Sequence, residues 1–121
     1  MNGEIQSYRD LVVWQKAMAL VKLIYQLTAH FPSQEQFGLT SQLRRSAVSI
    51  PSNIAEGNGR STTQDYLRFL QIARGSLFEA QTQLELAIQL QFTTQEASRE
   101  PLTLCNEIER MINSIITKLS R

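Results

Sequence analysis

Cysteine and histidine are almost absent from this chain of 121 residues, which has one of each, Cys105 and His30. A single cysteine excludes an internal disulfide, and no Cys/His grouping has the ligand spacing of a zinc site. Long apolar runs are also missing, because no stretch approaches the roughly 18 apolar residues that a membrane span requires. The first ten residues, MNGEIQSYRD, contain no apolar segment of the kind found in secretory signals. We therefore expect a cytoplasmic protein that is not inserted in a membrane.

A strong excess of charge is lacking too. Twelve lysines and arginines against eleven aspartates and glutamates give a net charge of +1, so the molecule as a whole does not attract polyanions strongly. Any such attraction must be local, and the arginines are unevenly placed. Between residues 37 and 78 the acidic residues are Glu56 and Asp65, whereas the basic residues are Arg44, Arg45, Arg60, Arg68 and Arg74.

What the chain does have is apolar residues at helical spacing. They recur at steps of three and four along four segments, and no segment alternates convincingly at the period of two typical of a strand. The first segment has two adjacent apolar rows, Leu11, Trp14, Met18, Val21 and Tyr25 beside Val13, Ala17, Leu20, Ile24, Leu27 and Phe31. The rows of the other three are Leu43, Ala47, Ile50 and Ile54; Tyr66, Leu70, Ala73, Leu77, Ala80, Leu84 and Ala87; and Leu104, Ile108, Met111, Ile112, Ile115 and Leu119. With short connections, these segments predict an all-α fold in one domain, an antiparallel up-down-up-down four-helix bundle. The helices are expected over about 11–31, 39–57, 62–91 and 94–119.

Capping residues predict where these helices start. Asp10 is a candidate N-cap of the first helix, since its carboxylate can accept hydrogen bonds from unpaired backbone N–H groups. Ser61 with Gln64, and Thr93 with Glu96, have the spacing of a capping box at the starts of the third and fourth helices.

Two prolines lie inside predicted helices. Pro51 cannot donate to the carbonyl of Ala47, at a cost on the order of 3 kcal/mol, so a kink is expected. Water, Ser49 or Ser52 is then the replacement donor to that carbonyl. Pro101 predicts a bend or a break in the fourth helix, with the regular part starting near residue 102.

Glycines and small polar residues predict close helix contacts. Gly57 or Gly59 is expected to end the second helix as its left-handed residue. Gly75 lies inside the third helix, where glycine costs roughly 0.5–1 kcal/mol relative to alanine, so it suggests that another backbone approaches there. A polar row, mostly of small side chains, follows one side of the second helix and permits close packing: Gln42, Ser46, Ser49, Asn53 and Glu56.

Few residues are suited to catalysis. His30 falls near the end of the first helix, where a cation suits the helix dipole, and we interpret Cys105 as a packing residue. We expect no catalytic residue, no metal site and no cofactor. Glu56 and Glu79 are interpreted as ion-pair partners of Arg44, Arg45 or Arg74 near the interface of the second and third helices, and an enzymatic function remains possible only if these two carboxylates hold a metal.

The first helix offers a possible partner surface. Its apolar stripe is wide enough to contact more than one neighbour, and Val12 and Leu23 fall on its otherwise polar side. Both are candidates for contact with another subunit.

Three stretches of the chain resemble a known family. DLVVWQKAMAL at 10–20, FPSQEQFGLTSQLRRSAVSIPSNIAEGNGR at 31–60 and YLRFLQIARGSLFEAQTQL at 66–84 are together similar to the four-helix-bundle proteins encoded in intervening sequences of bacterial 23S ribosomal RNA genes. The resemblance implies an antiparallel bundle that assembles as a ring-like or barrel-like homopentamer, and it brings no firm biochemical activity.

A related branch, the accessory variability proteins of diversity-generating retroelements, binds a reverse transcriptase and nucleic acid through a basic surface. The resemblance therefore marks this chain's own basic positions in the second and third helices as nucleic-acid-binding: Arg44, Arg45, Arg60, Arg68 and Arg74. Those relatives are more basic than +1.

Two functions follow from these observations. In the first, a non-enzymatic oligomer contacts phosphates of RNA, or of a protein–RNA complex, through a modest arginine surface, without recognising bases. In the alternative, the protein is a structural scaffold whose ring binds a partner protein, and its arginines are held in salt bridges to Glu56, Asp65 and Glu79.

Overall fold

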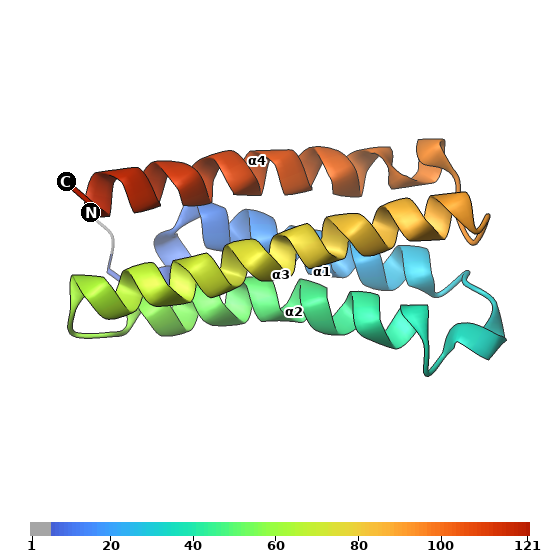
Figure 1. Ribbon diagram of the computed structural model, residues 1–121, viewed down its shortest axis with the longest axis horizontal. Coiled ribbons are helices and arrows are strands. Elements are labelled where there is room, and N and C mark those ends of the chain that lie inside the picture. Colours follow the sequence, from blue (N-terminus) through green and yellow to red (C-terminus); the bar gives the residue numbers. More distant parts are fainter. Residues whose placement is uncertain (1–5) are drawn as a thin grey trace.

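Four long helices make up most of the computed structural model, which describes residues 6–121 (Figure 1). Their bounds are α1 Val12–Thr28, α2 Leu39–Asn58, α3 Thr63–Gln89 and α4 Gln95–Leu119, with short 3-10 turns η1 at Tyr8–Asp10 and η2 at Ser33–Glu35. No strand occurs in the part of the chain that the structure describes. The prediction of an all-α four-helix bundle is therefore confirmed. Residues 1–5, half of the segment searched above for a secretory signal, lie outside the described residues.

Consecutive helices run in opposite directions (Figure 1). The start of α1 and the end of α4 consequently lie at the same end of the molecule, together with the α2–α3 turn. Each helix packs on two neighbours, α2 on α1 and α3, and α4 on α1 and α3. The contact between α2 and α3 is the most extensive of the four.

One hydrophobic core fills the space between the helices, and the predicted apolar rows build most of it. Of the two rows of α1, the one that begins at Val13 faces inward. The fully buried large side chains are Leu20, Ile24, Leu43, Ile50, Ile54, Leu70, Leu77, Leu84, Ile108 and Ile112. Cys105 joins this core, as predicted, whereas Leu27, Tyr66, Leu104 and Met111 lie half-buried at its edge. The other predicted row of α1, from Leu11 to Tyr25, is less covered, since Met18 and Tyr25 remain exposed.

The two predicted capping boxes each lie one residue too early. Thr62 and Thr94 are the N-caps of α3 and α4, and each side chain accepts from the backbone N–H three residues on, at 3.1 and 3.0 Å. Because Ser61 and Thr93 are also hydroxyl residues, the local sequence offers two equivalent caps at each start, and the path by which the chain enters the helix selects the second.

Asp10 caps a different element from the predicted one. Its Oδ2 accepts from the backbone N–H groups of Gln6 and Ser7, at 2.9 and 3.2 Å, and so closes η1. Helix α1 begins after Leu11 without a side-chain cap.

Neither proline interrupts its helix. Helix α2 continues through Pro51 and α4 through Pro101, so the break considered at Pro101 is not found. Both proline rings are buried, which offsets the loss of one backbone hydrogen bond. Ser52 donates to the Val48 carbonyl at 2.8 Å, so it does not serve the carbonyl that Pro51 leaves without a donor.

The glycine predictions need correction. Gly59 ends α2 with φ of −83°, a right-handed conformation, and the left-handed residue is Gln91, with φ of 64°, just after α3. Nothing lies within 4 Å of a Cβ placed on Gly75, so no backbone approaches it. The close approach is at Gly57, where a Cβ would lie 2.6 Å from the Cβ of Phe69.

Among residues 6–121, no helix is both long and apolar enough to cross a membrane.

Candidate nucleic-acid interface

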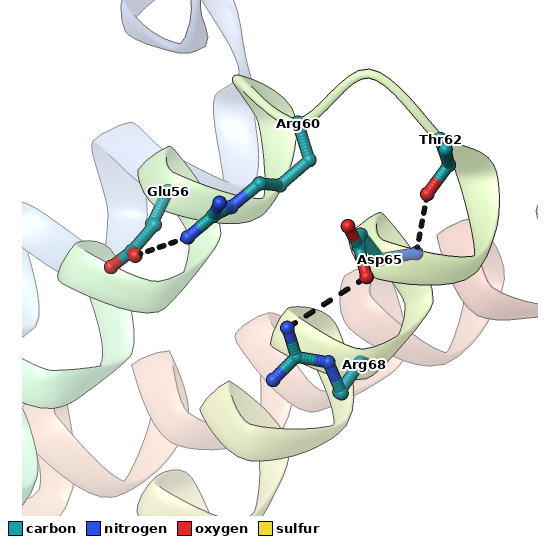
Figure 2. Close-up of polar contacts among 5 residues, drawn as sticks. All are labelled: Glu56, Arg60, Thr62, Asp65 and Arg68. Carbon is teal, nitrogen blue, oxygen red and sulfur yellow. Dashed lines mark hydrogen bonds and ion pairs between the residues drawn. The ribbon is translucent and has the colours of Figure 1, made fainter.

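Arg60 lies in the turn between α2 and α3, and Arg68 lies in the second helical turn of α3 (Figure 2). Their guanidinium carbons lie 4.8 and 4.7 Å from the centroid of one aromatic ring, that of Phe69. That ring is only 7% exposed, so the two cations lie over a side chain that is itself anchored in the fold. Such stacking is worth about 0.5–1 kcal/mol at exposed sites, and it orients both arginines at this end of the bundle.

Each of these arginines also has an acidic partner. Arg60 contacts Glu56 at 2.8 Å, one helical turn back, and Arg68 contacts Asp65 at 3.7 Å (Figure 2). The side chains of both pairs are between 43% and 59% exposed. Exposed ion pairs contribute about 0.2–1 kcal/mol, so a phosphate can replace the carboxylate as partner at little cost. The four groups carry no net charge, which makes this a weak anion site and a strongly salt-dependent one.

The other three arginines lie elsewhere. Arg44 points toward α1, where its Nε donates to Thr28 Oγ1 at 2.8 Å and its guanidinium lies 4.4 Å from the centroid of the Tyr25 ring. Arg74 donates to Asn113 Oδ1 of α4 at 2.8 Å. The structure therefore brings Arg60 and Arg68 together and does not join all five arginines in one patch.

Of Arg44, Arg45 and Arg74, only Arg45 is exposed. It lies on the α2–α3 side of the bundle and makes no hydrogen bond or ion pair within residues 6–121. Fifteen residues of helix and turn separate it from Arg60, which corresponds to about 20 Å along α2. The two can contact phosphates of one strand, several nucleotides apart, only if the strand follows the seam between α2 and α3.

The predicted ion pairs of Glu56 and Glu79 are not formed as expected. Glu56 pairs with Arg60 in the turn and not with Arg44, Arg45 or Arg74. Glu79 has no ion-pair partner in the described chain, although it lines the same groove as Arg45. The predicted pairs do not form because Arg44 and Arg74 turn toward α1 and α4, away from the interface between α2 and α3.

The middle of the polar row of α2, from Ser46 to Asn53, lies along the seam with α3, where its small side chains permit close packing. Ser46 Oγ donates to Gln83 Oε1 at 2.8 Å, and the hydroxyls of Ser49 and Ser76 lie 2.8 Å apart. Asn53 Nδ2 donates to Ser49 Oγ at 2.9 Å. The sequence indicated the α2 half of this seam but not Gln83 and Ser76. In the sequence, neither residue stands out within the apolar pattern of the third helix. In the structure, both lie on the side of α3 that faces α2.

The residues considered for catalysis are poorly placed for it. His30 is exposed in the turn after α1. Burial, and secondarily the charge of Glu109, raises the pKa of the Cys105 thiol to about 12, so the nucleophilic thiolate is strongly disfavoured. Across residues 6–121, no three His, Cys, Asp or Glu side chains are grouped in a way that could hold a metal ion.

Comparisons with known proteins identify the family. The profile described as 23S rRNA-intervening sequence protein matches residues 9–114. A solved structure from Bacteroides thetaiotaomicron VPI-5482, described as a protein with unknown function from the S23 ribosomal protein family, is similar over 87% of this chain and 98% of its own, with 29% identity and a TM-score of 0.78. No curated protein matches the chain. Since the family profile covers most of the sequence and the bundle agrees with a solved family member, this chain belongs to the 23S rRNA-intervening sequence protein family.

Proposed function

We propose that this protein is a non-enzymatic, homo-oligomeric four-helix bundle that binds RNA, or a protein–RNA complex, through its arginines. The single observation that supports this most directly is the orientation of Arg60 and Arg68 by one buried ring, with exposed and exchangeable carboxylate partners. Guanidinium groups form strong hydrogen bonds to phosphate oxygens, and contacts of this kind position a nucleic acid without recognising its bases. Arg45 extends the surface, while Arg44 and Arg74 support the helix packing.

Assembly is part of the proposal, because the local charge is small. A chain of net charge +1 with paired arginines binds RNA weakly as a single copy. A homopentamer, the state that the family resemblance implies, presents the α2–α3 turn several times, and avidity along a long RNA then multiplies weak contacts.

The test is a titration of labelled single-stranded RNA of mixed sequence, followed by fluorescence anisotropy at several salt concentrations. The Arg60→Gln/Arg68→Gln variant is compared with wild type and with an Arg99→Gln/Lys118→Gln control, which removes two exposed cations from α4. For single strands, the slope of log affinity against log salt falls by about 0.7 for each phosphate that the protein no longer neutralises. We expect a smaller slope and weaker binding only in the first variant. Wild-type binding that is insensitive to salt, or equal weakening in both variants, would refute a role for these arginines in phosphate binding.

A scaffold that binds a partner protein is the second candidate, and an apolar groove favours it. Between α1 and α2 lies a groove of about 330 Å³ that is lined by Trp14, Met18, Val21, Val48 and Pro51, among others. Met18 and Val48 are 46% and 40% exposed, so this groove leaves apolar side chains in contact with solvent. Either a neighbouring subunit or a partner protein can cover such a surface.

The two predicted contact residues of α1 lie on its other side. Val12 is 53% exposed and Leu23 is half-buried, and each lines a groove between α1 and α4. Light scattering distinguishes the two faces, with Met18→Lys/Val48→Lys in the first groove and Val12→Lys/Leu23→Lys in the others. If the α1–α2 groove forms the subunit contact, we expect the Met18→Lys/Val48→Lys variant to have the mass of a monomer and Val12→Lys/Leu23→Lys to keep the mass of the oligomer. If the α1–α4 side forms it, we expect the reverse. If the protein is monomeric before substitution, homo-oligomerisation is wrong.

A further inference from the structure

A second polar site lies along the seam between α2 and α3, away from the Arg60–Arg68 turn. It is a groove of about 340 Å³, within the usual size range for a small-molecule pocket. Four lining residues come from α2 and two from α3: Gln42, Arg45, Ser46, Ser49, Ser76 and Glu79. Every one of these side chains is polar, in contrast with the apolar groove between α1 and α2.

The floor of this groove is fixed by hydrogen bonds between the two helices. Ser46 contacts Gln83 at 2.8 Å, and Ser49 contacts Ser76 at 2.8 Å. Asn53 holds Ser49 further, through bonds of 2.8 and 2.9 Å to its carbonyl and its hydroxyl. A hydroxyl has two acceptor lone pairs besides its single donor, so these serines keep the capacity to bind a ligand while their positions are held.

The rim of the groove carries two opposite charges that are not paired. Arg45 and Glu79 are both exposed, and neither makes a hydrogen bond or an ion pair within residues 6–121. The other arginines of α2, of α3 and of the turn between them all have partners: Arg44 in α1, Arg60 in Glu56, Arg68 in Asp65 and Arg74 in α4. The groove therefore has one free cation and one free anion on opposite helices, above a floor of fixed hydroxyls.

We propose that this groove binds a small zwitterion, such as a free amino acid or a dipeptide. Its carboxylate pairs with the planar guanidinium of Arg45, which can form two parallel hydrogen bonds to it, and its ammonium pairs with Glu79. The serine floor satisfies the remaining polar atoms. A phosphate suits the groove less well, because Glu79 repels it, and a nucleobase lacks an aromatic partner on which to stack. Arg45 is common to this groove and to the proposed RNA surface, but Arg60 and Arg68 do not line the groove. Loss of RNA binding in Arg60→Gln/Arg68→Gln and loss of dipeptide binding in Arg45→Gln are therefore separate outcomes, and each proposal can fail without the other.

The experiment follows backbone amide NMR signals of the full chain during titration with glycyl-L-serine. Two blocked forms serve as matched ligands, N-acetyl-glycyl-L-serine without the ammonium and glycyl-L-serinamide without the carboxylate. We expect the free dipeptide to shift the amide signals of Ser46, Ser49 and Ser76. Each blocked form should bind about tenfold more weakly or worse, which is the effect of losing one charge-assisted hydrogen bond.

Substitutions assign each end of the ligand to its partner. In Arg45→Gln the free and amidated dipeptides should bind equally, and in Glu79→Gln the free and acetylated ones should. Arg99→Gln and Glu85→Gln, exposed residues outside the groove, should preserve the wild-type order. No shift at millimolar dipeptide, equal binding of free and blocked forms, or shifts that depend on protein concentration instead of dipeptide would overturn the proposal. The last result would mean that a second copy covers the groove.

Discussion

Gly57 provides the sharpest test of how closely α2 and α3 pack. A Cβ on this buried residue would lie 2.6 Å from Phe69 Cβ, 3.1 Å from Tyr66 Cδ1 and 3.4 Å from the Tyr66 carbonyl oxygen. Carbon atoms prefer about 3.5–4.0 Å, and Phe69 Cβ is fixed to the backbone, so a rotamer change cannot relieve the clash. One helix must move in the Gly57→Ala variant.

The expected effect is the difference of two terms. Replacing glycine by alanine in a helix gains about 1 kcal/mol when space is free, whereas overpacking of a tight contact costs about 1–3 kcal/mol. The overlap at Phe69 is severe, so we take the upper part of that range and expect Gly57→Ala to lower the free energy of unfolding by about 2 kcal/mol. Gly75→Ala is the matched control, since nothing lies within 4 Å of its Cβ. It should raise the free energy of unfolding by about 0.5–1 kcal/mol.

Urea denaturation followed by far-ultraviolet circular dichroism measures both effects at one protein concentration. Opposite signs for the two variants are the expected result. If Gly57→Ala is as stable as wild type, the two helices are not as close as the structure has them. If Gly75→Ala is destabilised and the loss depends on protein concentration, another copy occupies the surface around Gly75.

Four further predictions concern single side chains. Ser98→Ala should raise the free energy of unfolding by about 1–2 kcal/mol in urea, because the buried Ser98 Oγ has no hydrogen-bond partner among the described residues. A thiol reagent should label Cys105 at neutral pH only as fast as the protein unfolds, and rapid labelling of the native protein would contradict its burial and its pKa of about 12. A hydrogen bond from Lys16, and secondarily the charge of Lys16, lowers the pKa of Glu107 below its ordinary value of 4.5. This pair therefore stabilises the fold above pH 4.5, and the stabilisation is lost as the pH falls through the lowered pKa. The stability lost in Lys16→Met should therefore shrink on acidification, and in a Glu107→Gln background it should not depend on pH. Arg44→Gln should lower the free energy of unfolding by about 1–2 kcal/mol, since it removes the 2.8 Å hydrogen bond to Thr28 and the stacking of the guanidinium on Tyr25. A melting temperature equal to that of wild type would contradict this.

The fold could be predicted from the sequence because the apolar period is long and regular. Leu43, Ala47, Ile50 and Ile54 follow the helical repeat without exception, and all four are fully buried. Features that depend on a single residue were less predictable. The N-cap at Thr62 has a hydroxyl neighbour on each side, so only the path of the chain decides between them.

The glycines show why contacts between helices were harder to predict. Gly57 and Gly75 are both glycines within predicted helices, and the local sequence gives no sign of which one meets a neighbour. Gly57 faces α3, where Phe69 lies against it, whereas Gly75 faces outward. Which face of a helix meets its neighbour is settled by packing across the bundle, and this information is not in the local pattern.

The sequence indicated which arginines belong to the candidate site but not which of them lie together. The adjacent residues Arg44 and Arg45 show why. Adjacent residues on an α-helix point about 100° apart, so Arg44 and Arg45 cannot both face one partner. Arg44 turns to α1 and binds Thr28, whereas Arg45 turns to the seam with α3 and stays free. The same rotation places Ser46 and Ser49 beside Arg45, while Val48 and Pro51 line the apolar groove with α1. A charge reversal at both arginines therefore perturbs helix packing and an open polar groove together, so single substitutions are needed to separate stability from binding.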